Sequence, residues 1–257
     1  MLSKAVIKEI KALELKKNRD NQNLFVAEGR KLVSYLLPFF TCERLITHQK
    51  WAVPQDDIHL KELIYADAGE IRKVSFLKTP QDVVAVFRKP HHSLAEANPA
   101  SQLILTLDGL QNPGNLGTII RIAEWFGIEH IVCSMDTADA FNPKTVQATM
   151  GALAQVKIHY TALDQYLINN KGFPIYGTFL SGENIYQANL TSHGIILLGN
   201  EGNGIRPEIE SCINKKLHIP VYPSDHQTMG SLNVSTAAAI ICGEFRRRYS
   251  GDFFAQK

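Results

Sequence analysis

The chain has 257 residues, 45% of them hydrophobic and 20% charged, which is the composition of an ordinary globular protein with room for one or two domains. A formal net charge of +2 is too small to indicate a nucleic-acid partner by itself. The longest apolar stretch near the N-terminus, LVSYLLPFF, is too short to span a bilayer, so a membrane protein is excluded and a cytoplasmic location is expected.

Basic residues gather at both ends of the chain. Residues 1–31 hold eight lysines and arginines against four acidic residues, and a second cluster is Arg246, Arg247 and Arg248. Two interpretations stay open: a surface that binds phosphates, or solvated helix faces.

The four cysteines are far apart and form no C-x-x-C pair. Buried, reduced thiols are therefore expected, and no metal site is predicted.

The first third of the chain alternates between helical and strand-like segments. Residues 5–17 are predicted to form one helix, with Val6, Ile10 and Leu13 on a common face. Further helices are expected at 30–37 and 68–76, and strands at 24–29, 43–48, 62–67 and 82–87. This pattern predicts a small α/β domain, and the segment RKPHHSLAEANPAS at 88–101 is typical of a linker. The predicted domains are residues 1–95 and 96–257.

From residue 103 a second alternation begins. Strands are expected at 103–110, 130–135, 155–160, 174–180, 194–199 and 216–220, and helices at 115–127, 143–153, 163–171, 207–214 and from about 231. Strands that alternate with helices favour a mostly parallel sheet covered on both faces, with its sites at the carboxyl ends of the strands.

The loop DGLQNPGNLGTIIR follows the first strand of the second alternation. Asn115 is placed to cap the helix, and Arg121 falls in the second helical turn, on the buried side. The loop lacks the Lys-Ser/Thr of a P-loop. A salt bridge from Arg121 to Glu124 is the alternative to a functional role.

Two further strands end in polar loops. LLGNEGNGI carries Glu201 among three glycines, a pattern that indicates a loop and only weakly a ligand. GSLNVSTAAAII places Ser231 and Asn233 directly before an alanine-rich helix, which is more polar residues than a helix cap needs.

These three segments, in this order and at these spacings, resemble the signature motifs of the SpoU (TrmH) family. The motif residues are Asn115, Gly117 and Arg121, then Gly199, Glu201, Gly202 and Gly204, then Ile219, Pro220 and the run from Ser231 to Ser235. Members of this family are S-adenosylmethionine-dependent RNA 2′-O-ribose methyltransferases of the SPOUT class. The resemblance covers residues 103–248, and extends more loosely over residues 6–37 to the family's N-terminal substrate-binding domain.

The resemblance implies a C-terminal α/β fold with a deep trefoil knot and a mostly parallel sheet, a smaller N-terminal α/β domain that binds RNA, and a homodimer. It implies a catalytic set of Arg121, Asn115, Ser231, Asn233 and Glu201. The implied cofactor is S-adenosylmethionine, held by Gly199, Ile219, Leu232, Gly202 and Thr178. Ribosomal RNA is favoured over transfer RNA as substrate. The loop that holds Asp225 and His226 is longer than the family pattern, and an exposed loop is favoured there over an RNA contact.

A guanidinium, with a pKa above about 12, is a poor proton acceptor. We therefore expect Arg121 to hold the RNA phosphate and the developing alkoxide, while Asn115, Ser231 and Asn233 orient the ribose. Two alternatives stay open: a catalytically inactive RNA-binding protein, and an α/β enzyme that acts on a small nucleotide.

Overall fold

The computed structural model describes residues 2–49, 51, 53, 59–223 and 230–254. The described chain divides into two compact units, residues 1–91 with 139–154, and residues 92–138 with 155–257. The predicted loop residues Asp225 and His226 lie outside the described residues. Among the described residues no helix is long and apolar enough to cross a membrane.

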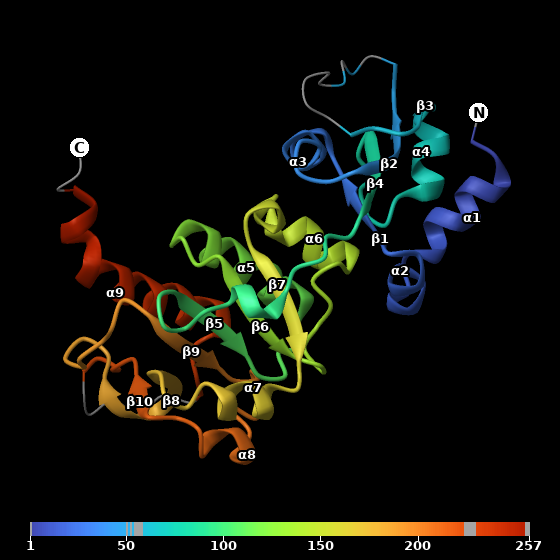
Figure 1. The fold of residues 1–257 in the computed structure, drawn as a ribbon. Coiled ribbons are helices and arrows are strands. Elements are labelled where there is room, and N and C mark those ends of the chain that lie inside the picture. The colour runs from blue at the N-terminus through green and yellow to red at the C-terminus, as the bar shows by residue number, and fades with distance from the viewer. Residues whose placement is uncertain (1, 50, 52, 54–58, 224–229, 255–257) are drawn as a thin grey trace. The chain divides into compact units, whose positions relative to one another are not determined.

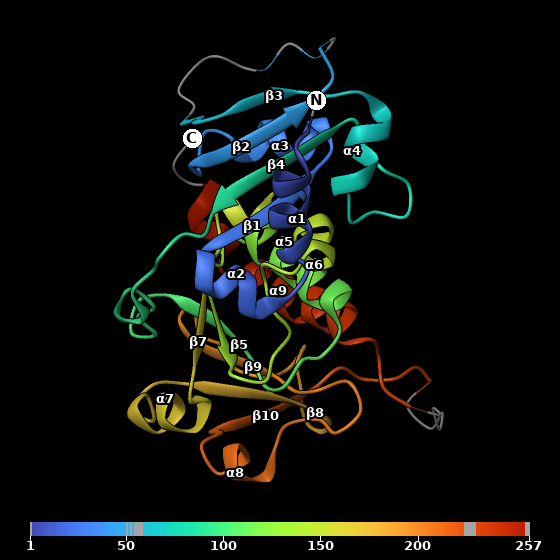
Figure 2. The same ribbon diagram turned by 90° about the vertical axis from the view of Figure 1, so that its right-hand side faces the viewer.

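The first unit is a four-stranded mixed sheet with helices on both faces (Figure 1). Its strands are β1 (Leu24–Glu28), β2 (Cys42–Thr47), β3 (Leu63–Tyr65) and β4 (Val83–Arg88), in the order β1-β4-β2-β3. Its helices are α1 (Lys4–Ala12), α2 (Lys16–Gln22), α3 (Arg30–Leu36), α4 (Ala68–Val74) and α6 (Pro143–Thr149), followed by the 3-10 turn η2 (Ala152–Ala154). Helices α1 and α4 lie on the face opposite α3, as Figure 2 also shows.

Each face of this sheet has its own apolar core. On one face, Ile10 and Leu13 of the N-terminal segment pack with Val26 and Val86 of the strands. On the other, Phe25 lies 5.4 Å from Phe87 and 5.1 Å from Phe141, measured between ring centroids. Phe141 therefore brings residues 139–154 into this unit, although they lie far along the chain.

The predicted single helix over residues 5–17 is wrong, because the chain forms two helices there. Helix α1 ends at Ala12, and α2 begins at Lys16 and ends at Gln22, where the capping residue Asn23 has a left-handed backbone with φ of 56°. The sequence KKNRDNQ of α2 has no apolar period. It is fixed instead by Arg19, whose side chain is 1% exposed and donates to the carbonyl oxygens of Leu13 and Glu14.

The second unit is a six-stranded sheet in which every strand pair is parallel, as predicted. Its strands are β5 (Leu103–Leu107), β6 (His130–Ser134), β7 (Lys157–Thr161), β8 (Ile175–Asn184), β9 (Gly194–Leu198) and β10 (Lys215–His218), in the order β10-β8-β9-β5-β6-β7. The helical elements are the turn η1 (Leu94–Glu96) and the helices α5 (Pro113–Trp125), α7 (Leu163–Asn169), α8 (Pro207–Glu210) and α9 (Val234–Phe254).

Helices cover both faces of the parallel sheet, again as predicted (Figure 1). Leu167 of α7 and Ile209 of α8 share a buried cluster with Ile104, Ile175 and Leu197 of the strands. On the opposite face Phe245 of α9 meets Tyr176 of β8 edge to face, with ring centroids 5.0 Å apart. The four cysteines are buried and free, as expected.

The strand order reverses between β5 and β9. From β5 the chain moves outward to β6 and β7, and it then returns to build β8, β9 and β10 on the other side. In open parallel sheets, ligands bind at the carboxyl ends of the strands beside such a reversal. The loops after β5 and β9 leave the sheet at this place.

Candidate functional site

The loops after β5 and β9 are joined by hydrogen bonds at both ends of the β9 loop. Asp108, which directly follows β5, is 1% exposed and accepts from the backbone N–H of Arg206 at 2.9 Å and from its Nε at 2.7 Å. Asn200 donates from Nδ2 to the carbonyl oxygen of Gly109 at 2.7 Å. The segment from Gly199 to Arg206 is therefore fastened to the end of β5.

The glycines of this loop have a steric role. A Cβ atom at residue 199 would lie 2.3 Å from the carbonyl carbon of Gly204, so only glycine fits there. Asn200 and Gly204 pair their backbones, and the Asn200 Oδ1 accepts from the N–H groups of Gly202 and Asn203. The loop thus folds back on itself and leaves Glu201 exposed at its tip.

Glu201 is the first member of a chain of hydrogen bonds that connects the three predicted motifs. The Nδ2 of Asn115 donates to Oε1 of Glu201 at 3.0 Å, and the Nδ2 of Asn233 donates to Oδ1 of Asn115 at 3.2 Å. The Asn233 Oδ1 in turn accepts from the backbone N–H of Ser235 at 2.9 Å and from its Oγ at 2.6 Å. Side chains that are 86 and 118 positions apart in the sequence are therefore in direct contact.

The prediction that Asn115 caps helix α5 is wrong. Helix α5 is capped by Asn112, whose side chain accepts from the N–H groups of Gly114 and Asn115, and Pro113 occupies the first helical position. Asn115 lies one turn further on, where its amide is available for Glu201 and Asn233. At the other end, Gly127 follows the helix with φ of 61°, which agrees with its predicted role as a terminator.

Asn233 has two roles at the start of α9. Its Oδ1 accepts from Ser235 as a helix cap does, and its backbone carbonyl accepts from Ala237. Its Nδ2 is left to hold Asn115. Ser231 and Leu232, just before it, are exposed, and Leu232 keeps half of its surface accessible.

Arg121 differs from its prediction, because it is exposed and not on the buried side of α5. Its guanidinium makes no hydrogen bond or ion pair with another residue that the structure describes, which leaves the alternative of a salt bridge to Glu124 without support. The structure does not bring Arg121 into the Glu201–Asn115–Asn233 chain.

The remaining predicted cofactor residues lie at the same edge of the sheet. Thr178 is the first residue of β8 beyond its pairing with β9, and Ile219 directly follows β10. Both are half-buried, whereas Gly202 is exposed. All five predicted cofactor residues therefore lie in or after strands that end at the carboxyl edge.

Sequence reasoning missed Asp108, Asn200 and Arg206. A carboxylate placed directly after a buried strand was the available signal for Asp108. No feature of the neighbouring sequence indicates that Asp108 pairs with Arg206, which is 98 positions away. The hydrogen bonds from Arg206 to Asp108 also raise the pKa of the arginine.

The three C-terminal arginines make hydrogen bonds within the second unit. Arg246 donates to the carbonyl oxygens of Phe126 and Gly127 at the end of α5. Arg247 and Arg248 both donate to Glu244, whose side chain is 5% exposed. These contacts favour a structural over a phosphate-binding interpretation of this cluster.

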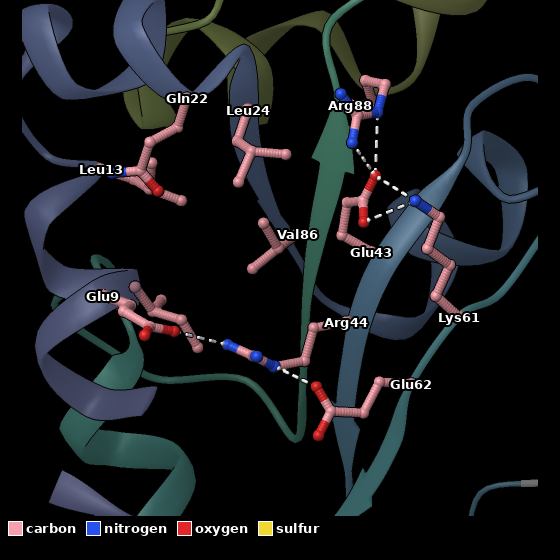
Figure 3. Close-up of a pocket in the computed structure, with 11 residues that line it drawn as sticks. Glu9, Leu13, Gln22, Leu24, Glu43, Arg44, Lys61, Glu62, Val86 and Arg88 are labelled. Atoms are coloured by element: carbon pink, nitrogen blue, oxygen red, sulfur yellow. Dashed lines mark hydrogen bonds and ion pairs between the residues drawn. The ribbon is translucent and has the colours of Figure 1, made fainter. Parts of the chain in front are cut away.

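A pocket of about 360 Å³ lies in the first unit, between the N-terminal helices and the sheet (Figure 3). Figure 3 shows Arg44 between Glu9 and Glu62, with nitrogen–oxygen distances of 3.2 and 2.6 Å. Because carboxylates already neutralise its cations, this pocket is a poor site for an anion. No group of three or more histidine, cysteine, aspartate or glutamate side chains that could hold a metal ion occurs in the described part of the chain.

Comparison with known proteins places both units. Residues 102–243 match the SpoU rRNA methylase family, and residues 4–85 match the MRM3-like substrate binding domain. Over 245 residues the chain is 32% identical to the 23S rRNA (guanosine(2553)-2′-O)-methyltransferase RlmP of Bacillus subtilis, covering 93% of this chain and 95% of that protein.

Solved structures agree over nearly the whole chain. A TrmH-family protein from Porphyromonas gingivalis has a TM-score of 0.84 at 38% identity, covering 96% of this chain and 99% of that one. The AdoMet-bound rRNA methyltransferase from Sinorhizobium meliloti has a TM-score of 0.81 at 28% identity, covering 96% of each chain. These matches confirm the resemblance drawn from the three motifs and the predicted α/β fold with a smaller N-terminal unit.

Proposed function

The chain belongs to the SpoU rRNA methylase family, and from this we propose that it transfers a methyl group from S-adenosylmethionine to a ribose 2′-hydroxyl of RNA. One observation carries the proposal: the hydrogen-bonded chain Glu201–Asn115–Asn233, which joins all three motif segments at the carboxyl edge of a parallel sheet. These hydrogen bonds hold the side chains of the three motifs next to one another and fix their orientations.

The residues at this edge fit S-adenosylmethionine. The glycines of the loop after β9 leave room for a ligand beside the backbone. Leu232 and Ile219 offer accessible apolar surface for the flat face of the adenine ring. We assign Gly199, Gly202, Ile219, Leu232 and Thr178 to its binding. When bound, the cofactor supplies a methyl group on a positively charged sulfur, which is the electrophile of the reaction.

The protein's part is to position the ribose and to stabilise its oxygen as that oxygen loses a proton. Positioning alone can contribute roughly 7–11 kcal/mol to lowering the barrier. Asn115, Asn233 and Ser231 orient the 2′-hydroxyl and its neighbours, and Glu201 holds the Asn115 amide in place. Arg121, exposed and not engaged with another described residue, holds the phosphate beside the target ribose and stabilises the developing alkoxide by charge.

Ribosomal RNA is the proposed substrate, in preference to transfer RNA. The match of residues 4–85 to a substrate-binding domain supports an RNA-binding role for the first unit, with the functional division near residue 95. Because residues 139–154 pack within this unit, deletion of residues 1–95 would uncover them. Single substitutions are therefore the better test of this role.

A homodimer, the deep knot and a cytoplasmic location are part of the same proposal. Trp125 at the end of α5 is 85% exposed, and tryptophan is enriched at protein–protein interfaces relative to the rest of the surface. Helix α5 also carries Asn115 and Arg121, so a dimer formed on this helix would lie close to the site.

Transfer of labelled methyl groups from S-adenosylmethionine to total RNA tests the proposal. We expect label in ribosomal RNA, recovered as a 2′-O-methylnucleoside after complete digestion. Label on a base, or RNA binding without any transfer, would overturn it, and the second result would favour the inactive RNA-binding protein. Label in transfer RNA alone would move the substrate to that class, and methylation of a free nucleotide alone would favour the small-nucleotide enzyme.

A further inference from the structure

Helix α3 of the first unit carries a line of exposed side chains that the proposed chemistry does not use. Lys31 and Tyr35 lie four residues apart and therefore on one side of α3, and Phe39 lies four residues further on, in the turn after the helix. Tyr35 is 41% exposed and Phe39 is 50% exposed. Phe39 stays on this side because the chain continues to turn after Leu36, with the Phe39 N–H donating to the Leu36 carbonyl. We call these three residues the α3 stripe.

The two rings of the α3 stripe are neighbours with a defined geometry. Their centroids are 5.8 Å apart and their planes are inclined by 34°. The Tyr35 ring also rests against Gly151, where a Cβ atom would come within 2.5 Å of the ring carbon Cδ1. Glycine at this position, with φ of 107°, therefore allows close approach of the ring to the backbone.

The charge of the stripe distinguishes it from the pocket in the same unit. In the pocket, Arg44 and Arg88 are paired with carboxylates (Figure 3). Lys31 is exposed and forms no ion pair with any residue that the structure describes. A cation one helical turn from the first of two neighbouring exposed aromatic rings complements a phosphate next to a base. Proteins that bind single-stranded RNA combine these same two elements.

We propose that the α3 stripe binds an unpaired nucleotide of the RNA substrate, with its base stacked on Tyr35 and Phe39 and its phosphate paired with Lys31. This rests on the proposed function only in that RNA is the substrate. It adds a structural requirement: the RNA must present an unpaired base to the first unit. A second protein molecule, which would use the rings without needing the lysine, is the competing occupant.

Binding of two RNA probes by the full-length protein tests the proposal. One probe is a 12-nucleotide single strand with a central 2-aminopurine, and the other is the same strand in a fully paired duplex. We expect the double variant Tyr35→Ala/Phe39→Ala to bind the single strand about 10- to 100-fold more weakly, with a lost quenching of 2-aminopurine fluorescence. Its duplex binding should change by less than about threefold.

Matched variants separate stacking from folding damage and from charge. Tyr65→Ala removes a tyrosine that is 46% exposed on β3 of the same unit, and it should bind both probes like the wild type. Tyr35→Phe should keep single-strand binding. Lys31→Gln should keep the fluorescence quenching but reduce the slope of log K against log salt by about 0.7, the share of one phosphate contact on a single strand.

Three results would overturn the proposal. The double variant could bind the single strand as well as Tyr65→Ala does, it could lose both probes equally, or it could change the molecular mass in solution while RNA affinity stays constant. The proposed function is read separately, from methyl transfer by the wild type. A wild type that binds the single strand through the stripe but transfers no methyl group would contradict that function and leave the stripe intact.

Discussion

The amide of Asn233 donates to the Oδ1 of Asn115 at 3.2 Å, although the two residues are 118 positions apart. Asn233 directly precedes the last helix and Asn115 lies in the first turn of α5, so one hydrogen bond joins the starts of two helices. Because Asn115 also holds Glu201, it is the central member of the chain and contacts both other motif segments.

Replacement of Asn115 is therefore expected to affect turnover more than cofactor binding. Asn115→Ala removes both contacts of the central amide, and we expect the rate constant for methyl transfer to fall about 100-fold, the scale of a lost positioning or polar group. The dissociation constant for S-adenosylmethionine, measured by calorimetry, should change by less than about threefold. Asn169→Ala, an exposed asparagine on α7 of the same unit, is the matched control. An equal fall in the rate constant for methyl transfer in Asn115→Ala and Asn169→Ala would contradict a specific role of Asn115.

Arg121 is predicted to act through its charge. Arg121→Lys keeps a positive charge and should retain measurable methyl transfer, at about one-tenth of the wild-type rate, whereas Arg121→Gln should lose about 100-fold or more. RNA affinity, from filter binding, should be little changed in Arg121→Lys. Since Arg121 is exposed, neither variant should lower the melting temperature noticeably. A lysine variant as inactive as the glutamine variant would count against the charge-based role.

Gly199 is expected to be indispensable for steric reasons. Its missing side chain makes room for the backbone of Gly204, 2.3 Å from where a Cβ atom would be, so Gly199→Ala must displace the loop that carries Glu201. We expect the dissociation constant for S-adenosylmethionine, measured by calorimetry, to rise at least about tenfold. Gly172→Ala is the matched control, because nothing lies within 4 Å of its added Cβ. Normal cofactor affinity in Gly199→Ala would separate this loop from the cofactor site.

Much of the fold was predictable because the parallel strands are apolar runs bounded by polar loops. Segments such as LILTL and GIILL are buried at every position, and this signal does not depend on contacts elsewhere. Helix α2 was missed because its seven residues contain no apolar side chain, and tertiary contacts of Arg19 fix it instead. Local pattern cannot predict a helix that is fixed in this way.

The site was predictable to the extent that its residues lie in three recognisable segments. The motifs indicated Asn115, Glu201 and Asn233, and the structure joins them directly. Capping by Asn112 was not predicted, because the run NPGN offers two asparagines and only the backbone decides between them. The pairing of Asp108 with Arg206 could not be predicted, since it depends on the strand order of the sheet.

The buried ion pair of Arg19 and Asp139 is predicted to be a major contribution to the stability of the first unit. The two side chains are 1% and 8% exposed, so removal of one leaves a buried charge without its partner. Arg19→Ala should lower the free energy of unfolding by about 3–5 kcal/mol in urea titrations. The exposed pair Arg30–Asp82 is the control, and Arg30→Ala should cost under about 1 kcal/mol.

The double variant Arg19→Leu/Asp139→Leu sharpens the same test. It removes both charges and should recover part of the loss in Arg19→Ala. The recovery stays incomplete because Arg19 also donates to the carbonyl oxygens of Leu13 and Glu14, which lose that donor. A double variant no more stable than Arg19→Ala would show that the unpaired carboxylate of Asp139 is not what destabilises Arg19→Ala.

Two stacked histidines predict a loss of stability in mild acid. His159 on β7 is 5% exposed, and its ring lies 5.3 Å from that of His130, with Nε2 and Nδ1 3.0 Å apart. Burial, and then the nearby charge of His130, lower the pKa of His159 from 6.5 to about 4, and burial also lowers the pKa of His130. Lys157 opposes protonation of both rings and Glu96 favours it; the effect of Glu96 is the larger of the two at His159, and that of Lys157 is the larger at His130.

The sign of the effect follows from the two pKa values of His159. Between about pH 6.5 and 4 the unfolded chain binds a proton at this residue that the folded chain does not. The contribution of His159 to the free energy of unfolding is therefore fully present above this range, and it is lost as the pH falls through it. Urea midpoints measured at pH 7.5, 6.0 and 4.5 should therefore decrease less steeply in His159→Gln than in the wild type. His91→Gln, an exposed histidine of the linker, should keep the wild-type profile. Parallel profiles for His159→Gln and the wild type would mean that the stacked pair does not cause the acid sensitivity.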